Sequence, residues 1–376
     1  MIYFDNAATT YPKPECVYKE LDRAFRENTF NVGRGAYRKS RESYEIIEDT
    51  KNKIRDLAKI NSGNIVFTPS ATYAMNQIIK GLNIKENSNV YITPFEHNAV
   101  ARPLKYYSIV NNFNIIMIPF DENQNLNVKS LKHSTTLYKP DFVFINNLSN
   151  VTGRIIDLES ITENFKRYET IIIVDAAQSF GLLNIDYSKK DIDYLVFAGH
   201  KNLYGPFGIG GYIDFKNRKV ESLIKGGTGS DSLDITDTNY EEAASKNITS
   251  IYALNKSLNW ILEKTVGNVC FYKKELTDYL INRLSKINKI TIYNTLKDIN
   301  SYIGIVSINH RDYLPDELGQ ILDEDFDIAV RTGYHCAPYI HELINTKKTL
   351  GVVRISLSYF NTKEEIDYLI KSLKEL

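Results

Sequence analysis

The sequence is poor in several features that would mark particular classes of protein. Its three cysteines, Cys16, Cys270 and Cys336, lie far apart and form no C-x-x-C pair, which argues against a disulfide scaffold or a cysteine-rich zinc site. No run approaches the roughly 20 apolar residues that span a bilayer, and the opening MIYFDNAATT lacks the features of a signal peptide. Basic and acidic residues both number 46, so no net charge attracts nucleic acid or anionic lipid. We expect a reduced, soluble, cytoplasmic protein that binds neither.

What the chain does contain is enough apolar material for a large core. Hydrophobic residues make up 43% of its 376 residues, and short apolar runs alternate with helical patterns through its first two thirds. Several runs are continuous, which indicates strands buried on both faces of an α/β sheet. The expected strands are Asn64–Thr68, Asn89–Thr93, Asn114–Ile118, Phe142–Asn146, Thr170–Val174, Tyr194–Ala198 and Ile209–Ile213, and the expected helices include Ala71–Leu82, Asn98–Val110, Leu158–Tyr168 and Ile248–Lys264.

The pattern changes after this region. A further helix continues to Ser285, and the strands and helices that follow suit a smaller α+β domain. We therefore predict a large α/β domain over residues 15–258 and a small α+β domain over residues 259–376, with residues 1–14 packed against the small one. The expected elements of the small domain are strands at Ile290–Tyr293, Tyr302–Asn309, Ile328–Arg331 and Val352–Ser356, and helices at Pro315–Leu322 and Lys363–Leu376.

Two strand ends carry the strongest chemical signal. TIIIVDAAQSFG is an apolar strand that runs into Asp175, and DYLVFAGHKNLYGPFGIGG places Lys201 just beyond another strand, 26 residues later. Ligands of open α/β sheets bind outside the carboxyl ends of the strands. A carboxylate for a pyridinium nitrogen and a desolvated lysine for an aldehyde are the two anchors of pyridoxal phosphate (PLP). Taken singly, Asp175 also suits a turn cap and Lys201 a solvated loop.

These motifs, D-A-A-Q and then A-G-H-K, resemble the class V aminotransferase family in its branch of cysteine desulfurases and selenocysteine lyases. The resemblance extends along nearly the whole chain. It implies a PLP-dependent transferase of fold type I, active as a homodimer. The supporting segments are FDNAATT, NVGRGAY with Arg34, FTPSATYAMN, FEHNA with His97, NLSNVTG with Asn150, RTGYHCAP with Cys336, and VRISLSYFNT with Arg354.

The resemblance assigns expected roles to these residues. Lys201 would be the Schiff-base lysine, and His97 would stack on the cofactor ring. The helix expected to begin at Ala71 would hold the cofactor phosphate at its N-terminus, which is a natural site for an anion. Arg354 interrupts an apolar strand and would bind a substrate carboxylate, although a structural salt bridge would also explain it. The predicted cofactor ligands are Ala71, Thr72, His97, Asn150, Asp175, Gln178, His200 and Lys201, and the predicted substrate ligands are Arg354, Arg331, Asn150 and Arg34.

Cys336 separates the possible activities. A thiolate is the reactive form of cysteine and is favoured by nearby cations, and His335 and Arg331 are close in sequence. As nucleophile, Cys336 would take sulfur from L-cysteine as a persulfide, release L-alanine and hand the sulfur to an acceptor protein. It could instead be inert, or bind zinc together with His335 and His341; we predict no metal. We expect Lys201, Cys336 and His97 to be the catalytic residues.

Two departures from the family pattern concern the cofactor phosphate. Ala198 stands where the family often has serine, and EEAASKNIT replaces a segment whose last threonine reaches the partner subunit's phosphate. Ile248 falls at that threonine's position, with Thr249 next to it. The predicted activity is cysteine desulfurase. Selenocysteine lyase, another class V aminotransferase or lyase, and a scaffold without turnover stay open, as do the sulfur acceptor and its pathway.

Overall fold

The computed structural model describes residues 1–32, 35–226, 233, 245–294 and 301–376. Its centre is a seven-stranded sheet in the order β2-β8-β7-β6-β5-β3-β4. Strands β3 to β7 run parallel, whereas β8 is antiparallel to both β7 and β2. The strands are β2 (Asn64–Thr68), β3 (Asn89–Ile92), β4 (Asn114–Met117), β5 (Phe142–Asn146), β6 (Ile171–Asp175), β7 (Tyr194–Ala198) and β8 (Gly210–Asp214).

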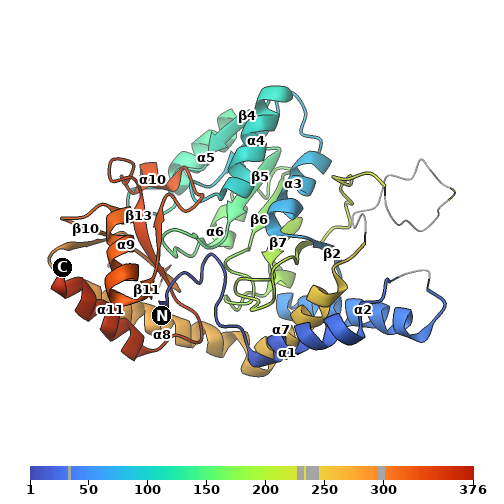
Figure 1. Ribbon diagram of the computed structural model, residues 1–376. Helices are drawn as coiled ribbons and strands as arrows, with labels where there is room; N and C mark the ends of the chain where they lie inside the picture. The colour runs from blue at the N-terminus through green and yellow to red at the C-terminus, as the bar shows by residue number, and fades with distance from the viewer. Residues whose placement is uncertain (33–34, 227–232, 234–244, 295–300) are drawn as a thin grey trace.

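Both faces of this sheet are covered by helices (Figure 1). Successive side chains of a strand point to opposite faces, so Val66 packs with helices α3 (Ala71–Gly81) and α4 (Asn98–Val110), while its neighbours Ile65 and Phe67 join the core beneath the other helices. Burial on both faces explains the continuous apolar runs of the strands. The helices of the second face are α1 (Glu15–Glu27), α2 (Arg38–Ala58), α5 (Val128–Leu137), α6 (Leu158–Thr162) and α7 (Ile248–Lys264).

A second, four-stranded antiparallel sheet lies at one end of the molecule, where Figure 1 shows it beside the C-terminal helices. It has its own apolar core, to which Phe4 of the N-terminal segment contributes. Its order is β12-β13-β10-β9, formed by β9 (Ile290–Ile292), β10 (Ile305–His310), β12 (Arg331–Gly333) and β13 (Val352–Ser356). Its helices are α8 (Val266–Leu284), α9 (Pro315–Phe326) and α11 (Lys363–Glu375), whereas the short α10 (Ile340–Leu343) packs with the core of the large sheet.

The first residues of the chain are attached to this second sheet region. Strand β1 (Ile2–Tyr3) pairs in parallel with β11 (Ile328–Ala329), and Asp5 forms an isolated bridge with Ser356 at the end of β13. The N-terminus therefore lies next to strands more than 300 residues away in sequence. This attachment brings Asp5 and Ala7 to the border between the two sheets.

Most expected elements have the bounds predicted from sequence, to within a residue or two. The helix expected over 158–168 ends at Thr162 and gives way to turns, and the strand expected over 328–331 is divided between β11 and β12. The long helix α2 was not among the expected elements. The division of the chain at residue 258 stays a prediction. Within the described ranges, no helix is both long and apolar enough to cross a membrane.

Candidate active site

A cavity of about 230 Å³ opens where the carboxyl ends of the parallel strands meet the second sheet. It is lined by every predicted site residue except Arg34, which falls outside the described residues. The lining residues named in advance are Ala71, Thr72, His97, Asn150, Asp175, Gln178, Ala198, His200, Lys201, Arg331, Cys336 and Arg354. The cavity also has walls of Ala7, Ala8, Ser70, Asn146 and His335 that we did not predict.

Asp175 and Lys201 reach the cavity from neighbouring parallel strands. Asp175 ends β6, and Lys201 lies three residues beyond the end of β7. Burial lowers the pKa of Lys201 to about 8, against the opposing effect of the Asp175 charge. Burial likewise raises the pKa of Asp175, while the N–H of Ala177, at 2.9 Å from Oδ1, and the charge of Lys201 oppose the rise. The pair thus combines a readily neutralised amine with a sheltered carboxyl group.

His97 caps the helix that follows β3. Its Nδ1 accepts a hydrogen bond from the backbone N–H of Ala99 at 3.0 Å, so a neutral ring carries its proton on Nε2. Burial lowers the pKa of His97 to about 3, and the charge of Lys201 is the next largest cause. The ring is therefore uncharged at neutral pH and offers the cavity an aromatic surface.

The N-terminus of α3 lines the cavity through Ser70, Ala71 and Thr72. Ser70 caps this helix by accepting from the N–H of Tyr73 at 3.1 Å, and the first N–H groups of any α-helix lack partners within it. Gly210 of β8 permits the close approach, because a Cβ there would lie only 2.9 Å from the backbone nitrogen of Ala71. Such a helix end favours a negatively charged group.

His200 lines the same cavity. Its ring stacks on Phe207 with centroids 4.7 Å apart, and its buried Nδ1 has no hydrogen-bond partner in the described structure. Burial, followed by the charges of Lys201 and Lys13, lowers the pKa of His200 to about 3. The unsatisfied nitrogen of a neutral ring can donate to an anion at the α3 terminus.

Cys336 occupies a strained loop that is tied to the large sheet. His335 and Cys336 both have left-handed backbones, with φ of 47° and 56°. Residues other than glycine seldom adopt this conformation. Two hydrogen bonds of 2.7 Å hold the loop: the N–H of Asn98 donates to the Cys336 carbonyl, and the Asn150 amide to the His335 carbonyl. The thiol is exposed, and the first of these bonds anchors its loop next to His97.

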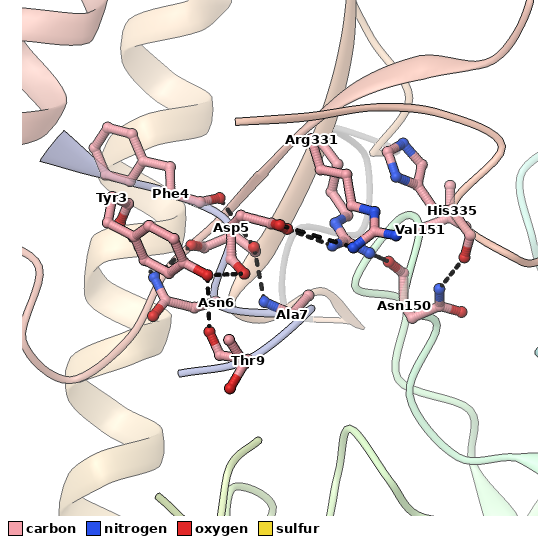
Figure 2. Close-up of polar contacts among 12 residues, drawn as sticks. Tyr3, Phe4, Asp5, Asn6, Ala7, Thr9, Asn150, Val151, Arg331 and His335 are labelled. Carbon is pink, nitrogen blue, oxygen red and sulfur yellow. Dashed lines mark hydrogen bonds and ion pairs between the residues drawn. The ribbon is translucent and has the colours of Figure 1, made fainter. Parts of the chain in front are cut away.

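Asn150, predicted to bind cofactor or substrate, also serves the protein itself. Its side chain holds the cysteine loop, and its backbone carbonyl accepts from Arg354 Nη1 at 3.0 Å. Its Oδ1 is buried without a partner. One residue therefore links the loop of Cys336 to the guanidinium of Arg354. Figure 2 shows its bond to His335.

The two arginines face each other across antiparallel strands, since Arg331 of β12 is the register partner of Arg354 of β13. The Asp5 carboxylate lies with both of them: Oδ1 is 2.6 Å from Arg354 Nη2, and Oδ2 is 3.8 Å from Arg331 Nη1. Figure 2 shows the Asp5 carboxylate directed at Arg331. Burial lowers the pKa of Arg354, and Asp5 opposes the change.

Asp5 was missed in the sequence because nothing in FDNAATT points to residues 331 and 354. The one available hint was an aspartate directly after the apolar start of the chain. A strand-end carboxylate of this kind has too many ordinary roles to be assigned one.

His335 does not act as the cation that its position suggested. Its Nε2 lies 3.0 Å from the Val352 carbonyl, and burial, followed by the charge of Arg354, keeps its pKa well below the usual value. With this ring neutral, Lys201 and Arg354 are the cations whose charges interact with that of Cys336. His341 uses both ring nitrogens, on Thr346 and on the Tyr334 carbonyl, and thus has none free for a metal.

A buried network supports the cavity from behind. Lys273 of α8 donates to Asn202 Oδ1 at 2.9 Å, Asn202 donates to the Gln178 carbonyl at 2.5 Å, and Gln178 Nε2 donates to the Ala7 carbonyl at 2.7 Å. Burial lowers the pKa of Lys273 to about 7. Through this network a helix packed on the second sheet contacts the residue that follows Lys201.

Comparison with known proteins shows the family of the chain. The family model of the class V aminotransferases matches residues 2–369 of this chain. A probable cysteine desulfurase of Methanothermobacter thermautotrophicus is 28% identical, over 100% of this chain and 94% of its own. A cysteine desulfurase of Wigglesworthia glossinidia brevipalpis is 30% identical, over 99% and 92%. The apo structure of a cysteine desulfurase from Thermococcus onnurineus superposes with a TM-score of 0.91 at 27% identity, over 100% and 94%.

Proposed function

Because the chain belongs to the class V aminotransferase family, we propose that it is a PLP-dependent cysteine desulfurase that converts L-cysteine to L-alanine and collects the sulfur on Cys336. The observation that carries this proposal is the shared cavity. Lys201 and Asp175 line it from the large sheet, and Cys336 and Arg354 line it from the segments around the second sheet. A PLP fold without a nucleophile at this place would suit an aminotransferase; the exposed Cys336 favours sulfur transfer.

The residues present fit the cofactor. Lys201 would hold the aldehyde carbon, Asp175 would pair with the ring nitrogen, and His97 would cover the ring. The N-terminus of α3 at Ala71 and Thr72, with the unsatisfied Nδ1 of His200, suits the phosphate. Bound there, PLP supplies an electron sink next to the α-carbon of an amino acid.

Ala198 and the N-terminus of α7 bear on the strength of phosphate binding. Ala198 lines the cavity without offering a hydroxyl group. Thr249 Oγ1 is hydrogen-bonded to Asn247 Oδ1 at 3.0 Å, as part of the start of α7. We therefore assign the phosphate to the N-terminus of α3 and to His200. We also propose that the enzyme is a homodimer.

The chain's own groups then perform three tasks on the substrate. Arg354 and Arg331 bind the α-carboxylate, since both line the cavity and a guanidinium matches a carboxylate in shape and charge. Lys201, with its pKa near 8, exchanges protons close to neutral pH. His97 stays neutral, so its Nε2–H donates without adding charge to the cavity.

Cys336 carries out the sulfur transfer. Its thiolate attacks the sulfur of the bound cysteine, an S–S bond forms, and the substrate's C–S bond breaks. The carbon fragment keeps the electron pair of that bond, takes up a proton and leaves as L-alanine. The sulfur stays on Cys336 as a persulfide, and the exposure of this residue leaves it open to an acceptor thiol.

The test is to incubate the PLP-loaded enzyme with L-cysteine and dithiothreitol and to quantify alanine and sulfide together. We expect equal amounts of both from the wild type and neither from Cys336→Ala, which should still carry the cofactor's visible absorption. Cys16→Ala is the matched control, because Cys16 is a half-buried cysteine of α1 outside the cavity. Alanine formation by Cys336→Ala at the wild-type rate would disprove the assigned nucleophile.

A further inference from the structure

The carboxylate-binding end of the cavity contains an acid that does not face the ligand. Asp5 contacts both arginines but does not line the cavity. Among the described residues, it is the only carboxylate that forms an ion pair with either guanidinium. Two arginines and one aspartate leave a single net positive charge to receive a ligand.

Asp5 is held in place by bonds other than those of its own side chain. The Ser356 N–H donates to the Phe4 carbonyl at 2.6 Å, and the Ala7 N–H donates to Ser356 Oγ at 2.9 Å. The Tyr3 hydroxyl donates to the Asp5 carbonyl at 3.1 Å (Figure 2). Because residues i and i+2 of a strand share a face, Ser356 secures the turn beside Arg354. The fold therefore holds the backbone around Asp5 independently of the arginines, with the carboxylate in contact with both of them.

The arginines keep unused donors for a ligand. Arg354 gives one bond to Asn150 and one to Asp5, and its buried Nε has no partner. The Arg331 guanidinium makes no hydrogen bond to any other described residue, and its long contact with Asp5 is its one ion pair among them. One more carboxylate would complete this arrangement, whereas a second negative charge would face Asp5 across the same two arginines.

We propose that Asp5 is a positioning and specificity residue, which aims Arg354 and sets the site's charge so that it accepts ligands with one carboxylate and disfavours dianions. This rests on the proposed function only in taking the arginine site as the place where the substrate carboxylate binds. It implies a substrate whose side chain is uncharged on binding.

The test compares two ligands of equal carbon count, propionate with one carboxylate and malonate with two, titrated into the PLP-loaded enzyme by calorimetry. In Asp5→Asn we expect the preference for malonate over propionate to rise about tenfold or more, because a unit charge within ~4 Å contributes that much to a second charge. In Asp5→Asn/Arg331→Gln, which restores the net charge, the preference should return to the wild-type value. Asp312→Asn, which removes a surface acid paired with Lys289 and Arg311, should leave it unchanged.

A purely structural role for Asp5 would weaken both ligands alike, so an unchanged ratio in Asp5→Asn overturns the proposal. Should Asp5→Asn fail to fold, Arg331→Gln alone must shift the ratio toward propionate by a similar factor. An unchanged ratio in Arg331→Gln would then overturn the proposal. The titration needs no turnover, and alanine formation is measured on the same wild-type preparation. A shifted ratio in Asp5→Asn, with no alanine formed by the wild type, supports the role of Asp5 and rejects the desulfurase activity. Alanine formation by the wild type with an unshifted ratio supports the desulfurase activity and rejects the role of Asp5.

Discussion

The two walls of the cavity treat buried positive charge in opposite ways. On the wall formed by the large sheet, burial brings the pKa of Lys201 to about 8 and those of His97 and His200 to about 3. On the wall formed by the second sheet, Arg354 is buried yet stays charged. Its intrinsic pKa is far above neutrality, and Asp5 stabilises the charged form.

This difference divides the labour within one cavity. Groups that can lose their charge near neutral pH are able to move protons, and a permanent charge paired with a fixed acid can orient a ligand. Cys336 lies between the walls, on a loop that bonds to the large sheet through Asn98 and Asn150. The following experiments test whether the two walls differ in function as they differ in charge.

Replacing Lys201 should have the largest effect. In Lys201→Ala we expect alanine formation from L-cysteine to fall by about 10³-fold or more, because covalent holding and proton transfer are lost together. The visible band of the bound cofactor, near ~420 nm in PLP–lysine enzymes, should also disappear. Lys51→Ala removes a shielded lysine from α2, far from the cavity lining, and should retain both. A normal band in Lys201→Ala would refute the assignment.

On the other wall, shape should matter in addition to charge. Arg354→Lys keeps the positive charge but loses the planar fork, so we expect kcat/KM for L-cysteine to fall about tenfold to a hundredfold, mostly through KM. Arg331→Lys should cost less, because the Arg331 side chain is 45% exposed and forms only a long ion pair. Steady-state kinetics of both variants checks this; equal losses would mean that the two arginines share the carboxylate evenly.

Lys273 extends the comparison to the junction between the walls. Its pKa is lowered to about 7 by burial, so between pH 7 and its usual value the unfolded chain binds one more proton than the folded chain. The free energy of unfolding should therefore rise with pH, by at most about 1.4 kcal/mol per pH unit from pH 7 to 9. Urea unfolding of Lys273→Met should lack this increment, whereas Lys274→Met, which removes the partner of Asp278, should keep it.

Glu96 should show the opposite slope at lower pH. It is fully buried next to β3, accepts from Thr93 Oγ1 at 2.6 Å and from the Asn146 N–H at 2.7 Å, and burial raises its pKa to about 8. A raised carboxyl pKa means that stability is lost as pH rises toward 8. Glu96→Gln keeps both bonds and should remove this loss, about 1.4 kcal/mol between pH 6 and 7. Parallel pH profiles of the two proteins would contradict the buried, neutral carboxyl group.

Much of the fold followed from local sequence pattern. Tyr194–Ala198 and Val352–Ser356 were predicted with the bounds that the structure has, because a run of β-branched and aromatic residues bounded by turns has few other conformations. Helix α2 was missed because its sequence is strongly polar, and even its buried positions include Ser40, Ser43 and Thr50. Its burial depends on α7, which comes about 200 residues later.

The sequence by itself determined which residues could do the chemistry: Asp175 and Lys201 at successive strand ends, Cys336 in an irregular loop, and Arg354 within an apolar strand. These signals are local, because each depends on the residues beside it. Only the tertiary structure decided their charges and partners. It neutralised His335 by burial, turned Asn150 toward the cysteine loop, and placed Asp5 against an arginine 349 residues away. Desolvation and ion pairing depend on distances in space, which a linear pattern does not contain.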